Sequence, residues 1–327
     1  MTSVPYPVYP ERTLSCRLWG GPRLRELLDL PDPGSGDPWG ESWQVYGGNT
    51  IGNGPWRGRT LQEAADAWGA ALLGSAALER YGTRFPLLAK IIGAGQDLSL
   101  QVHPDDRQAA ALEPALDGTG KAEAWLVLEA GPGAAVYRGF RSAVTADQVR
   151  SAVAAGTLQQ LLNRFEVSAG DVIMNPPGMV HAIGADIVLF EIQQPSDITY
   201  RLYDWARRDS AGQLRDLHVE QALAVADLSA EAAETVAPTP LRAGELQLVR
   251  SEHFVMTQLE PAEAGVLQTD TVSVELLTAL DREVRLLSEN GQQLRLPAGT
   301  SLVLPAADLT YELYGAGRLI RCNLPPG

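Results

Sequence analysis

Short apolar runs that end at glycine or proline recur along the chain. FPLLAKII, LSLQVHP, AWLVLEAGPG, GDVIMNPPG and DIVLFEIQQ are examples. Runs of this length, bounded by turn residues, are typical of β-strands. The 327 residues also include 32 glycines and 22 prolines, which supply turns for many such strands. These features predict a mainly β fold.

Two segments predict α-helices between the strands. TLQEAADAWGAALLG begins with Thr60 and Glu63 at the spacing of a capping box. TADQVRSAVAAGTLQQLLNRF repeats this spacing with Thr145 and Gln148. We therefore expect a few helices inserted among the strands.

The mass of 35.1 kDa allows one large domain or two ordinary ones. The stretch from about residue 226 to 245 is rich in Ala, Pro and Glu and predicts a linker. Strands follow it, with a hairpin turn expected at Asn290-Gly291. We expect a first domain over residues 1–235 and a second, β-rich domain over residues 236–327.

A weak internal repeat relates these two parts. AGDVIMNPPGMVHAI, from Ala169, is similar to AGTSLVLPAADLTYEL, from Ala298, because both contain a Gly turn, an apolar strand and then proline. Two related β-barrels would produce this pattern, and so would the common composition of β-turns. The second copy has no histidine where the first has His181. We therefore expect no comparable site in the second domain.

Charge and composition exclude several classes of partner. The formal net charge of −14 argues against nucleic acid or an anionic membrane, although a local pocket for a small anion is compatible with it. The two cysteines, Cys16 and Cys322, cannot form a disulfide framework. The N-terminus has no apolar signal region, and no run approaches the ~18 apolar residues of a membrane span. We expect a cytoplasmic protein, and the sequence makes no prediction about its oligomeric state.

The run LSLQVHPDD places polar residues on one face of an expected strand. Residues i and i+2 of a strand point to the same side. Ser99, Gln101 and His103 therefore share a face, and the two leucines and the valine lie on the other. The apolar face is typical of core, whereas the polar face needs a separate explanation.

Further polar residues occur in apolar surroundings. Lys121 and Glu123 are two apart at the start of the next strand, and His181 follows the turn NPPGMV. Two histidines (His103 and His181), one carboxylate and the amide oxygen of Gln101 form a plausible set of four metal ligands. Histidine and carboxylate suit zinc. The same set also suits the Fe(II) of non-heme oxygenases, so the residues alone leave the metal open.

Lysine is nearly absent from the chain. The 26 basic residues include only Lys90 and Lys121, which flank the run LSLQVHPDD. A compact ammonium group differs from a guanidinium in what it can bind, so these positions are candidates for function. Glu191 lies in the apolar run FEIQQ, where a carboxylate is costly unless it is paired or acts as an acid or base. Arg201 follows among aromatic residues, either as a structural partner of Glu191 or as an anion clamp.

Four motifs resemble, in order and spacing, those of type I mannose-6-phosphate isomerases. They are QVHPDD, GKAEAW, PPGMVHAIG and QQPSDITYRLYDWAR. LWGG at 18–21, GESW at 40–43 and FPLLAK at 85–90 are also similar, and the resemblance extends from about residue 8 to 225. It implies the short bacterial branch of a family of the cupin superfamily, with two cupin-like jelly-roll β-barrels and a few inserted α-helices. It also implies a zinc-dependent enzyme, with one Zn²⁺ per chain, that interconverts mannose 6-phosphate and fructose 6-phosphate through a cis-enediol.

The resemblance also implies roles for individual residues. It makes His103, Glu123 and His181 zinc ligands, and Gln101 matches an amide ligand. Arg201 matches an active-site arginine, Glu191 and Lys121 match residues for proton transfer, and Lys90 and Ser99 match phosphate contacts. The partner would be a small sugar phosphate.

Other functions would use the same barrel. A metal-dependent cupin oxygenase would need the two histidines and the glutamate, but not a phosphate-binding Lys90. A non-catalytic sugar-phosphate-binding protein would need no base, and the presence of Glu191, Lys121 and Arg201 argues against it. An isomerase for a different sugar phosphate is a third alternative.

Overall fold

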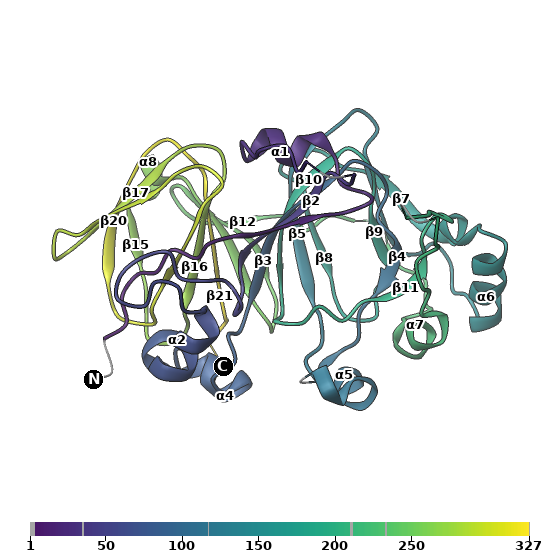
Figure 1. The fold of residues 1–327 in the computed structure, drawn as a ribbon, viewed down its shortest axis with the longest axis horizontal. Helices are drawn as coiled ribbons and strands as arrows, with labels where there is room; N and C mark the ends of the chain where they lie inside the picture. The colour runs from purple at the N-terminus through teal and green to yellow at the C-terminus, as the bar shows by residue number, and fades with distance from the viewer. Residues whose placement is uncertain (1–3, 35, 117, 210–211, 233, 327) are drawn as a thin grey trace. The chain divides into compact units, whose positions relative to one another are not determined.

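Strands dominate the structure, a computed structural model that describes residues 4–34, 36–116, 118–209, 212–232 and 234–326 (Figure 1). The strands are β1 (Thr13–Cys16), β2 (Trp39–Val45), β3 (Leu88–Ala94), β4 (Leu100–Val102), β5 (Glu123–Ala130), β6 (Ala135–Phe140), β7 (Leu162–Glu166), β8 (Val172–Asn175), β9 (His181–Ile183), β10 (Ile187–Gln193), β11 (Tyr200–Tyr203), β12 (Thr239–Arg242), β13 (Glu245–Arg250), β14 (Val255–Leu259), β15 (Val266–Gln268), β16 (Glu275–Ala279), β17 (Val284–Ser288), β18 (Gln293–Leu296), β19 (Ser301–Leu304), β20 (Thr310–Tyr314) and β21 (Leu319–Asn323). The prediction of a mainly β fold is confirmed.

The helices are short and lie between the strands. They are α1 (Pro22–Leu27), α2 (Leu61–Trp68), α3 (Ala70–Leu73), α4 (Ser75–Tyr81), α5 (Asp106–Leu112), α6 (Ala146–Ala154), α7 (Val219–Val225) and α8 (Pro261–Ala264), with 3₁₀ turns η1 (Pro114–Leu116) and η2 (Leu158–Leu161). None of the helices in the described ranges is both long and apolar enough to cross a membrane.

The chain forms two compact units. The central unit contains Leu14–Glu41 and Ile91–Val236, and the terminal unit contains Met1–Thr13, Ser42–Lys90 and Ala237–Gly327. The units therefore separate near residue 236, but two N-terminal segments pack with the C-terminal residues. The division of roles between residues 1–235 and 236–327 stays a prediction.

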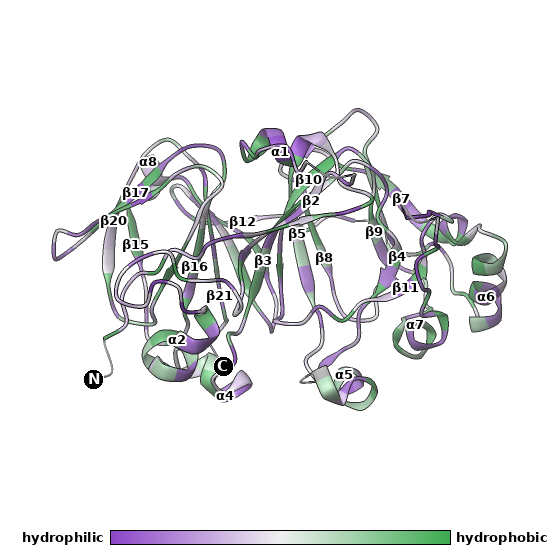
Figure 2. Ribbon diagram, viewed as in Figure 1, coloured by the Kyte–Doolittle hydropathy of each residue, from purple (hydrophilic) through white to green (hydrophobic). Residues whose placement is uncertain are grey.

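Two sheets enclose the core of the central unit. One has the order β1-β2-β3-β10-β5-β8 and the other β11-β4-β9-β6-β7. We call the apolar residues between them the central core: it joins Trp125, Leu189 and Ile173 of the first sheet to Val136 and Ile183 of the second. Strands β3 and β10 are buried along their whole length, and Figure 2 shows hydrophobic residues along β3. Continuous apolar runs in the sequence therefore correspond to strands with little contact with water.

A second apolar cluster lies on the other side of the five-stranded sheet. It contains Leu100 and Val102 of β4 together with Val149 of α6 and Ala222 of α7. Leu98, which precedes β4, packs instead in the central core. Helices α6 and α7 thus cover the apolar face of β4, and its polar face is left for the site.

The terminal unit repeats the two-sheet arrangement. Its sheets have the orders β12-β13-β14-β21-β16-β19 and β15-β20-β17-β18. Residues of both sheets form one core, including Leu277 and Leu302 of the first and Leu286 and Leu313 of the second. Strands β19 and β8, which carry the repeated sequence pattern, occupy the same place at the end of their sheets.

The partners of a buried carboxylate differ between the two units. Glu275 begins β16 as Glu123 begins β5. The carboxylate of Glu275 accepts two hydrogen bonds from Arg321, at 2.8 and 2.5 Å, and a third from Asn323 at 3.2 Å. The terminal unit therefore neutralises this buried carboxylate with its own guanidinium.

The helix predictions are correct at their starts and wrong at their ends. Thr60 and Thr145 form the expected capping boxes of α2 and α6. The first helix stops at Gly69, whose φ of +50° leaves the helical region, and α3 follows as a separate turn. The second stops at Ala154, and the residues LNRFE form strand β7 because they pair with β6.

The C-terminal predictions are also partly corrected. The segment expected to be a linker includes β12 and the start of β13 at Glu245. The hairpin at Asn290-Gly291 is present between β17 and β18, with Gly291 at a φ of +82°. Helices α5 and α7 were not predicted from the sequence.

Candidate metal centre

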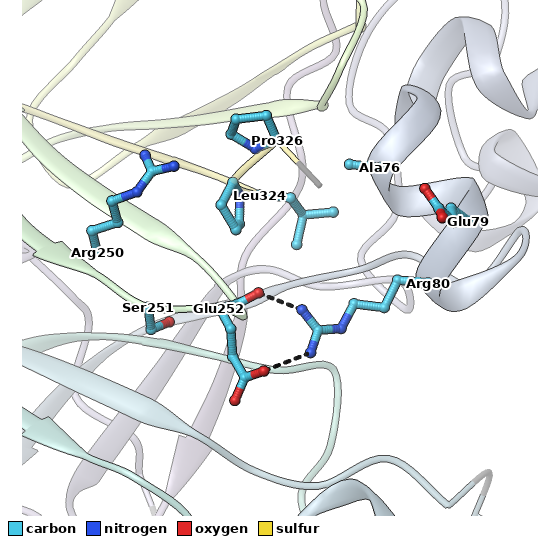
Figure 3. A pocket seen from close by; sticks show the side chains of 9 residues that line it. Ala76, Glu79, Arg80, Arg250, Ser251, Glu252, Leu324 and Pro326 are labelled. Carbon is cyan, nitrogen blue, oxygen red and sulfur yellow. Dashed lines mark hydrogen bonds and ion pairs between the residues drawn. The ribbon is translucent and has the colours of Figure 1, made fainter.

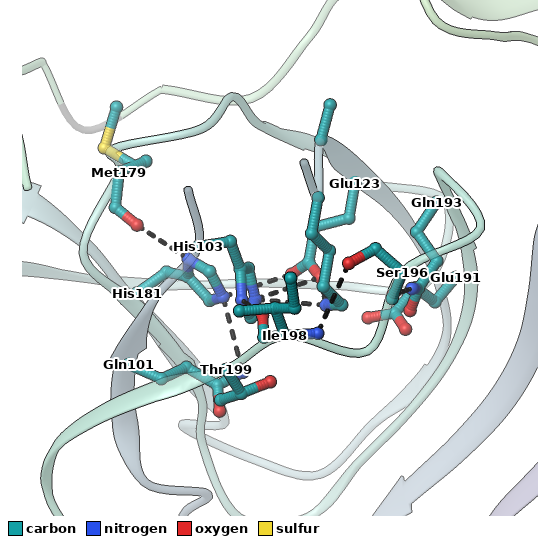
Figure 4. A network of polar contacts seen from close by, with 12 residues as sticks. Gln101, His103, Glu123, Met179, His181, Glu191, Gln193, Ser196, Ile198 and Thr199 are labelled. Atoms are coloured by element: carbon teal, nitrogen blue, oxygen red, sulfur yellow. Dashed lines mark hydrogen bonds and ion pairs between the residues drawn. The ribbon is translucent and has the colours of Figure 1, made fainter. Parts of the chain in front are cut away.

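Three buried side chains from separate strands meet in the central unit. His103 follows β4, Glu123 begins β5, and His181 begins β9. Their candidate ligand atoms all lie within 4.8 Å of one another. Nε2 of His103 lies 3.3 Å from Oε2 of Glu123, and Nε2 of His181 lies 3.1 Å from Oε1 (Figure 4). The site therefore unites residues that are far apart in the sequence.

Backbone carbonyls set the orientation of both imidazoles. Nδ1 of His103 is 2.8 Å from the carbonyl oxygen of Ile198, and Nδ1 of His181 is 2.9 Å from that of Met179 (Figure 4). A carbonyl only accepts, so each Nδ1 carries the proton and donates it. In the neutral rings Nε2 is then an acceptor directed at Glu123. Such hydrogen bonds from the second ring nitrogen are typical of metal-binding histidines.

In this arrangement the Nε2 lone pairs of both histidines face the carboxylate oxygens of Glu123, so that hydrogen-bond acceptors lie against one another. Oε1 of Glu123 has no hydrogen-bond donor among the described residues, because Nε2 of His181 at 3.1 Å has no proton to give. A cation stabilises two imidazole lone pairs beside a buried carboxylate. Two nitrogen ligands and one oxygen ligand suit zinc. The donor set thus fits a metal ion.

Lys121 supplies a positive charge to the same atoms. Its Nζ is 3.0 Å from Nε2 of His103 and donates a hydrogen bond to Oε2 of Glu123. Burial, followed by the charge of Lys121, lowers the pKa of His103 to about 4. Burial acts to raise the pKa of Glu123, but Lys121 and both histidines overcome it, and this pKa lies well below its ordinary value. His103 and Glu123 are therefore deprotonated at neutral pH, as metal binding requires.

A row of side chains crosses the five-stranded sheet beside these ligands. Gln101 is paired with His181 on one side and with Arg201 on the other. Its Nε2 is 3.4 Å from Nε2 of His181, and Ser99 donates to its Oε1 at 3.4 Å. The predicted shared face of Ser99 and Gln101 is present. Rotating the Gln101 amide by 180° would exchange its nitrogen and oxygen, so that Oε1, an atom able to bind a metal, would lie beside His181.

Arg201 is half-buried at the end of this row. Its Nη1 donates to the carbonyl oxygen of Asp216 at 2.8 Å. Burial, followed by the charge of Arg215, lowers the pKa of the guanidinium, whereas Asp204 raises it. Asp204 is itself buried and lies 3.5 Å from Nη1 of Arg215. Arg201 thus belongs to a positively charged cluster whose other members were not predicted from the sequence.

Glu191 lies on the same face of its sheet as Glu123. Strand β10 pairs Glu191 with Trp125 and Gln193 with Glu123. Oε2 of Glu191 accepts a hydrogen bond from Nε1 of Trp125 at 3.0 Å, and the Trp125 ring stands edge-on to His181 with centroids 5.4 Å apart. Glu191 and Gln193, which are two residues apart, therefore both face the interior with Glu123.

Lys90 belongs to the terminal unit and lies on β3. It is buried, and its Nζ is 4.7 Å from the centroid of the Trp43 ring. This is a cation–π contact, which stabilises a desolvated ammonium. The predicted phosphate contact of Lys90 stays a prediction.

A separate pocket of about 570 Å³ lies in the terminal unit (Figure 3). It is lined by Ala76, Glu79, Arg80, Arg250, Ser251, Glu252, Leu324, Pro325 and Pro326. Arg80 donates to the backbone of Glu252 and pairs with its carboxylate at 3.9 Å. The lining residues carry both positive and negative charges and do not form a set of metal ligands. This pocket is therefore a weaker candidate for the functional site than the metal centre.

The double-sheet fold is that of a cupin-type protein, as the family resemblance implied, and the buried His–Glu–His group is a candidate metal site within it. Residues 11–123 match the family described as phosphomannose isomerase type I, catalytic domain. The mannose-6-phosphate isomerase of Streptococcus mutans is 33% identical over 311 residues, which cover 94% of this chain and 95% of that protein. Mannose-6-phosphate isomerase ManA of Bacillus subtilis is 38% identical over 223 residues, or 68% of this chain and 67% of the relative. The chain belongs to the type I phosphomannose isomerase family.

Solved structures agree with this assignment. The mannose 6-phosphate isomerase of Bacillus subtilis superposes with a TM-score of 0.84 at 27% identity, over 97% of this chain and 99% of that one. A mannose 6-phosphate isomerase described as holo and zinc bound has the same fold, with a TM-score of 0.77 at 18% identity over 97% of this chain and 98% of that one. The predicted fold class and family are confirmed.

Asn175 and Asp204 are buried polar residues of the site region that the sequence reasoning missed. A signal for Asn175 was present, because it is two residues after Ile173 in a strand and so shares the inward face. Asp204 had no comparable signal, since its turn lies between aromatic residues and arginines.

Proposed function

We propose that this protein is a zinc-dependent aldose–ketose isomerase that interconverts mannose 6-phosphate and fructose 6-phosphate through a cis-enediol. The observation that carries the proposal is the cluster of three buried acceptors, His103, Glu123 and His181, in a chain whose relatives are named mannose-6-phosphate isomerases. Aldose–ketose isomerisation moves a proton between C1 and C2, which requires a base and stabilisation of a developing negative charge.

His103, Glu123 and His181 would hold the zinc ion, with Gln101 as a fourth ligand. When bound, zinc supplies a Lewis acid that polarises a sugar oxygen. The carbonyl oxygens of Ile198 and Met179 keep both imidazoles in the tautomer that binds metal.

Glu191 is the proposed base that takes the carbon-bound proton. Its carboxylate is buried and is oriented by the indole of Trp125. Burial of a carboxylate favours proton uptake at neutral pH, which suits a general base. Lys121, next to the ligands, is the proposed group for moving protons at the sugar oxygens.

Positive side chains would bind the charges of the substrate. Arg201 is proposed to stabilise the negative charge of the enediolate, because a half-buried guanidinium is a fixed charge in a poorly solvated place. Lys90 and Ser99 are proposed to contact the phosphate, where an ammonium acts as a point charge.

The test is conversion of mannose 6-phosphate to fructose 6-phosphate, measured in a coupled assay before and after removal of metal with a chelator. We expect activity that chelation abolishes and zinc restores, with about one zinc per chain by elemental analysis. Full activity in protein without bound metal would exclude the proposal. Oxygen uptake on addition of Fe(II) would instead indicate an oxygenase.

A further inference from the structure

Asn175 lies directly opposite Glu123 in the central unit. It is the last residue of β8, and the β5–β8 pairing sets Asn175 against Glu123 and Ile173 against Trp125. Opposed residues of antiparallel strands point to the same face. Ile173 and Trp125 both pack in the central core. The side chain of Asn175 therefore enters the interior of the unit beside Glu123.

The amide of Asn175 is unsatisfied in this position. The residue is 1% exposed, and neither Oδ1 nor Nδ2 has a hydrogen-bond partner among the described residues. Burial of an unpaired amide opposes folding, and almost all buried polar groups in proteins are paired. An exception in a folded protein is expected at a functional site, where a ligand completes the hydrogen bonds.

Asn49, in the terminal unit, shows how the same residue is satisfied for structure alone. It is also 1% exposed. Its Oδ1 accepts from the backbone N–H of Tyr46 at 2.7 Å, and its Nδ2 donates to the carbonyl oxygen of Glu11 at 2.9 Å. The two asparagines are thus equally buried, but the amide of Asn49 is hydrogen-bonded within the protein and that of Asn175 is not.

We propose that Asn175 binds a hydroxyl group of the sugar phosphate and so helps to select the substrate. This inference rests on the proposed function. A primary amide offers a donor and an acceptor, and a sugar hydroxyl offers both in return. Glu123, opposite Asn175, is a proposed ligand of the zinc ion, which would polarise an oxygen at the reacting carbons C1 and C2. Asn175 is therefore suited to the hydroxyl on C3 or C4, which does not react.

The first measurement compares the stability of Asn175→Leu and Asn49→Leu with that of the wild type, without substrate. Leucine has the branched shape of asparagine and no polar atoms. Asn175→Leu should raise the melting temperature because it removes an unsatisfied amide, whereas Asn49→Leu should lower it because it strands two backbone groups. Asn175→Ala against Asn49→Ala repeats the comparison without added volume, in case leucine does not fit.

The second measurement is kcat/KM. Asn175→Leu should lower kcat/KM for mannose 6-phosphate by about tenfold or more, the usual effect of losing one buried hydrogen bond to a substrate. With mannose 6-phosphate that lacks the hydroxyl on C3, or on C4, one of the two analogues should be converted equally by variant and wild type. Asn49→Leu should keep the wild-type kcat/KM per folded molecule.

Two results would overturn the inference. An Asn175→Leu enzyme that is stabilised and fully active would show that the amide binds nothing in the reaction. A variant destabilised as much as Asn49→Leu would show that Asn175 has partners within the folded protein. Turnover of mannose 6-phosphate by the wild type distinguishes failure of the proposed function from failure of this inference. An inactive wild type refutes the proposed function, whereas with an active wild type the variants test the role of Asn175.

Discussion

Replacing Lys121 with methionine should weaken the metal-free protein and strengthen metal binding. The Lys121 ammonium contacts Nε2 of His103 at 3.0 Å and the carboxylate of Glu123, and the Lys121 and Glu123 side chains are 4% and 0% exposed. Methionine has a similar length and no charge, so it leaves Glu123 without its cation. Removing one partner of a buried ion pair costs about 3–5 kcal/mol of unfolding free energy.

The same substitution should cost little when zinc is bound, because the ion supplies the positive charge. By thermodynamic linkage, the difference between the two costs appears as metal affinity. A loss of ~3–5 kcal/mol confined to the metal-free state lowers the dissociation constant for zinc by roughly two to four orders of magnitude. Lys121→Met should thus bind zinc more tightly, although it is expected to isomerise the substrate slowly.

The assay is urea unfolding of both proteins in chelator and in saturating zinc, with the zinc affinity measured by competition against a chromophoric chelator. Lys90→Met is the matched control, because Lys90 is an equally buried lysine in the terminal unit. The control should lose the same stability in both conditions and keep the wild-type affinity. An Lys121→Met protein that behaves like this control would refute the reasoning.

Three other predictions follow from the site. The pKa of His103 is about 4 in the folded protein and near 6.5 in the unfolded chain, so the unfolded chain takes up a proton first as the pH falls. The contribution of His103 to the stability of the metal-free protein is therefore complete above pH 6.5 and falls by about 3 kcal/mol as the pH drops to about 4. The urea midpoint should be lower at pH 5 than at pH 7, and His103→Gln should reduce this difference. Lys90→Ala should raise KM for mannose 6-phosphate and leave unphosphorylated mannose unaffected, whereas equal losses on both would make Lys90 structural. Arg201→Ala should lower kcat by about 10²–10³ with KM nearly unchanged. Its lost contact is to the carbonyl oxygen of Asp216, so the urea midpoint should fall only slightly; a large fall with normal kcat would mean that Arg201 serves the fold.

The strands and the inward faces of the site could be predicted because they follow from alternation. The alternation of LSLQV placed Ser99 on the same face as Gln101, and the structure has both side chains in contact. Helix starts were predictable from capping boxes for the same reason, since the signal is local. The meeting of His103, Glu123 and His181 depends on strand pairing over long distances, so the residues alone made a shared metal site plausible, and the family resemblance assigned their roles.

Other features had no local signal. The segment LNRFE continues a helical pattern, and only its pairing with β6 makes it a strand. Trp205 and Ala206 adopt φ values of +57° and +50°, although glycine and asparagine are the residues that usually mark such turns. The turn is held by distant contacts, including a hydrogen bond from Nε1 of Trp205 to the carbonyl oxygen of Leu98 at 2.8 Å. Tertiary contacts of this kind cannot be predicted from neighbouring residues.

The Glu275–Arg321 pair makes the terminal unit independent of the metal supply. The cation beside Glu275 is a covalent part of the chain, so neither chelators nor competing metals can remove it. Glu123 also has a cation of the chain beside it, Lys121, but the zinc ion proposed to bind there exchanges with the solution. We therefore expect shortage of metal to produce molecules whose terminal unit is unaffected, whereas their central unit is less stable and inactive. Such molecules would regain activity at the speed of metal binding, without new protein synthesis.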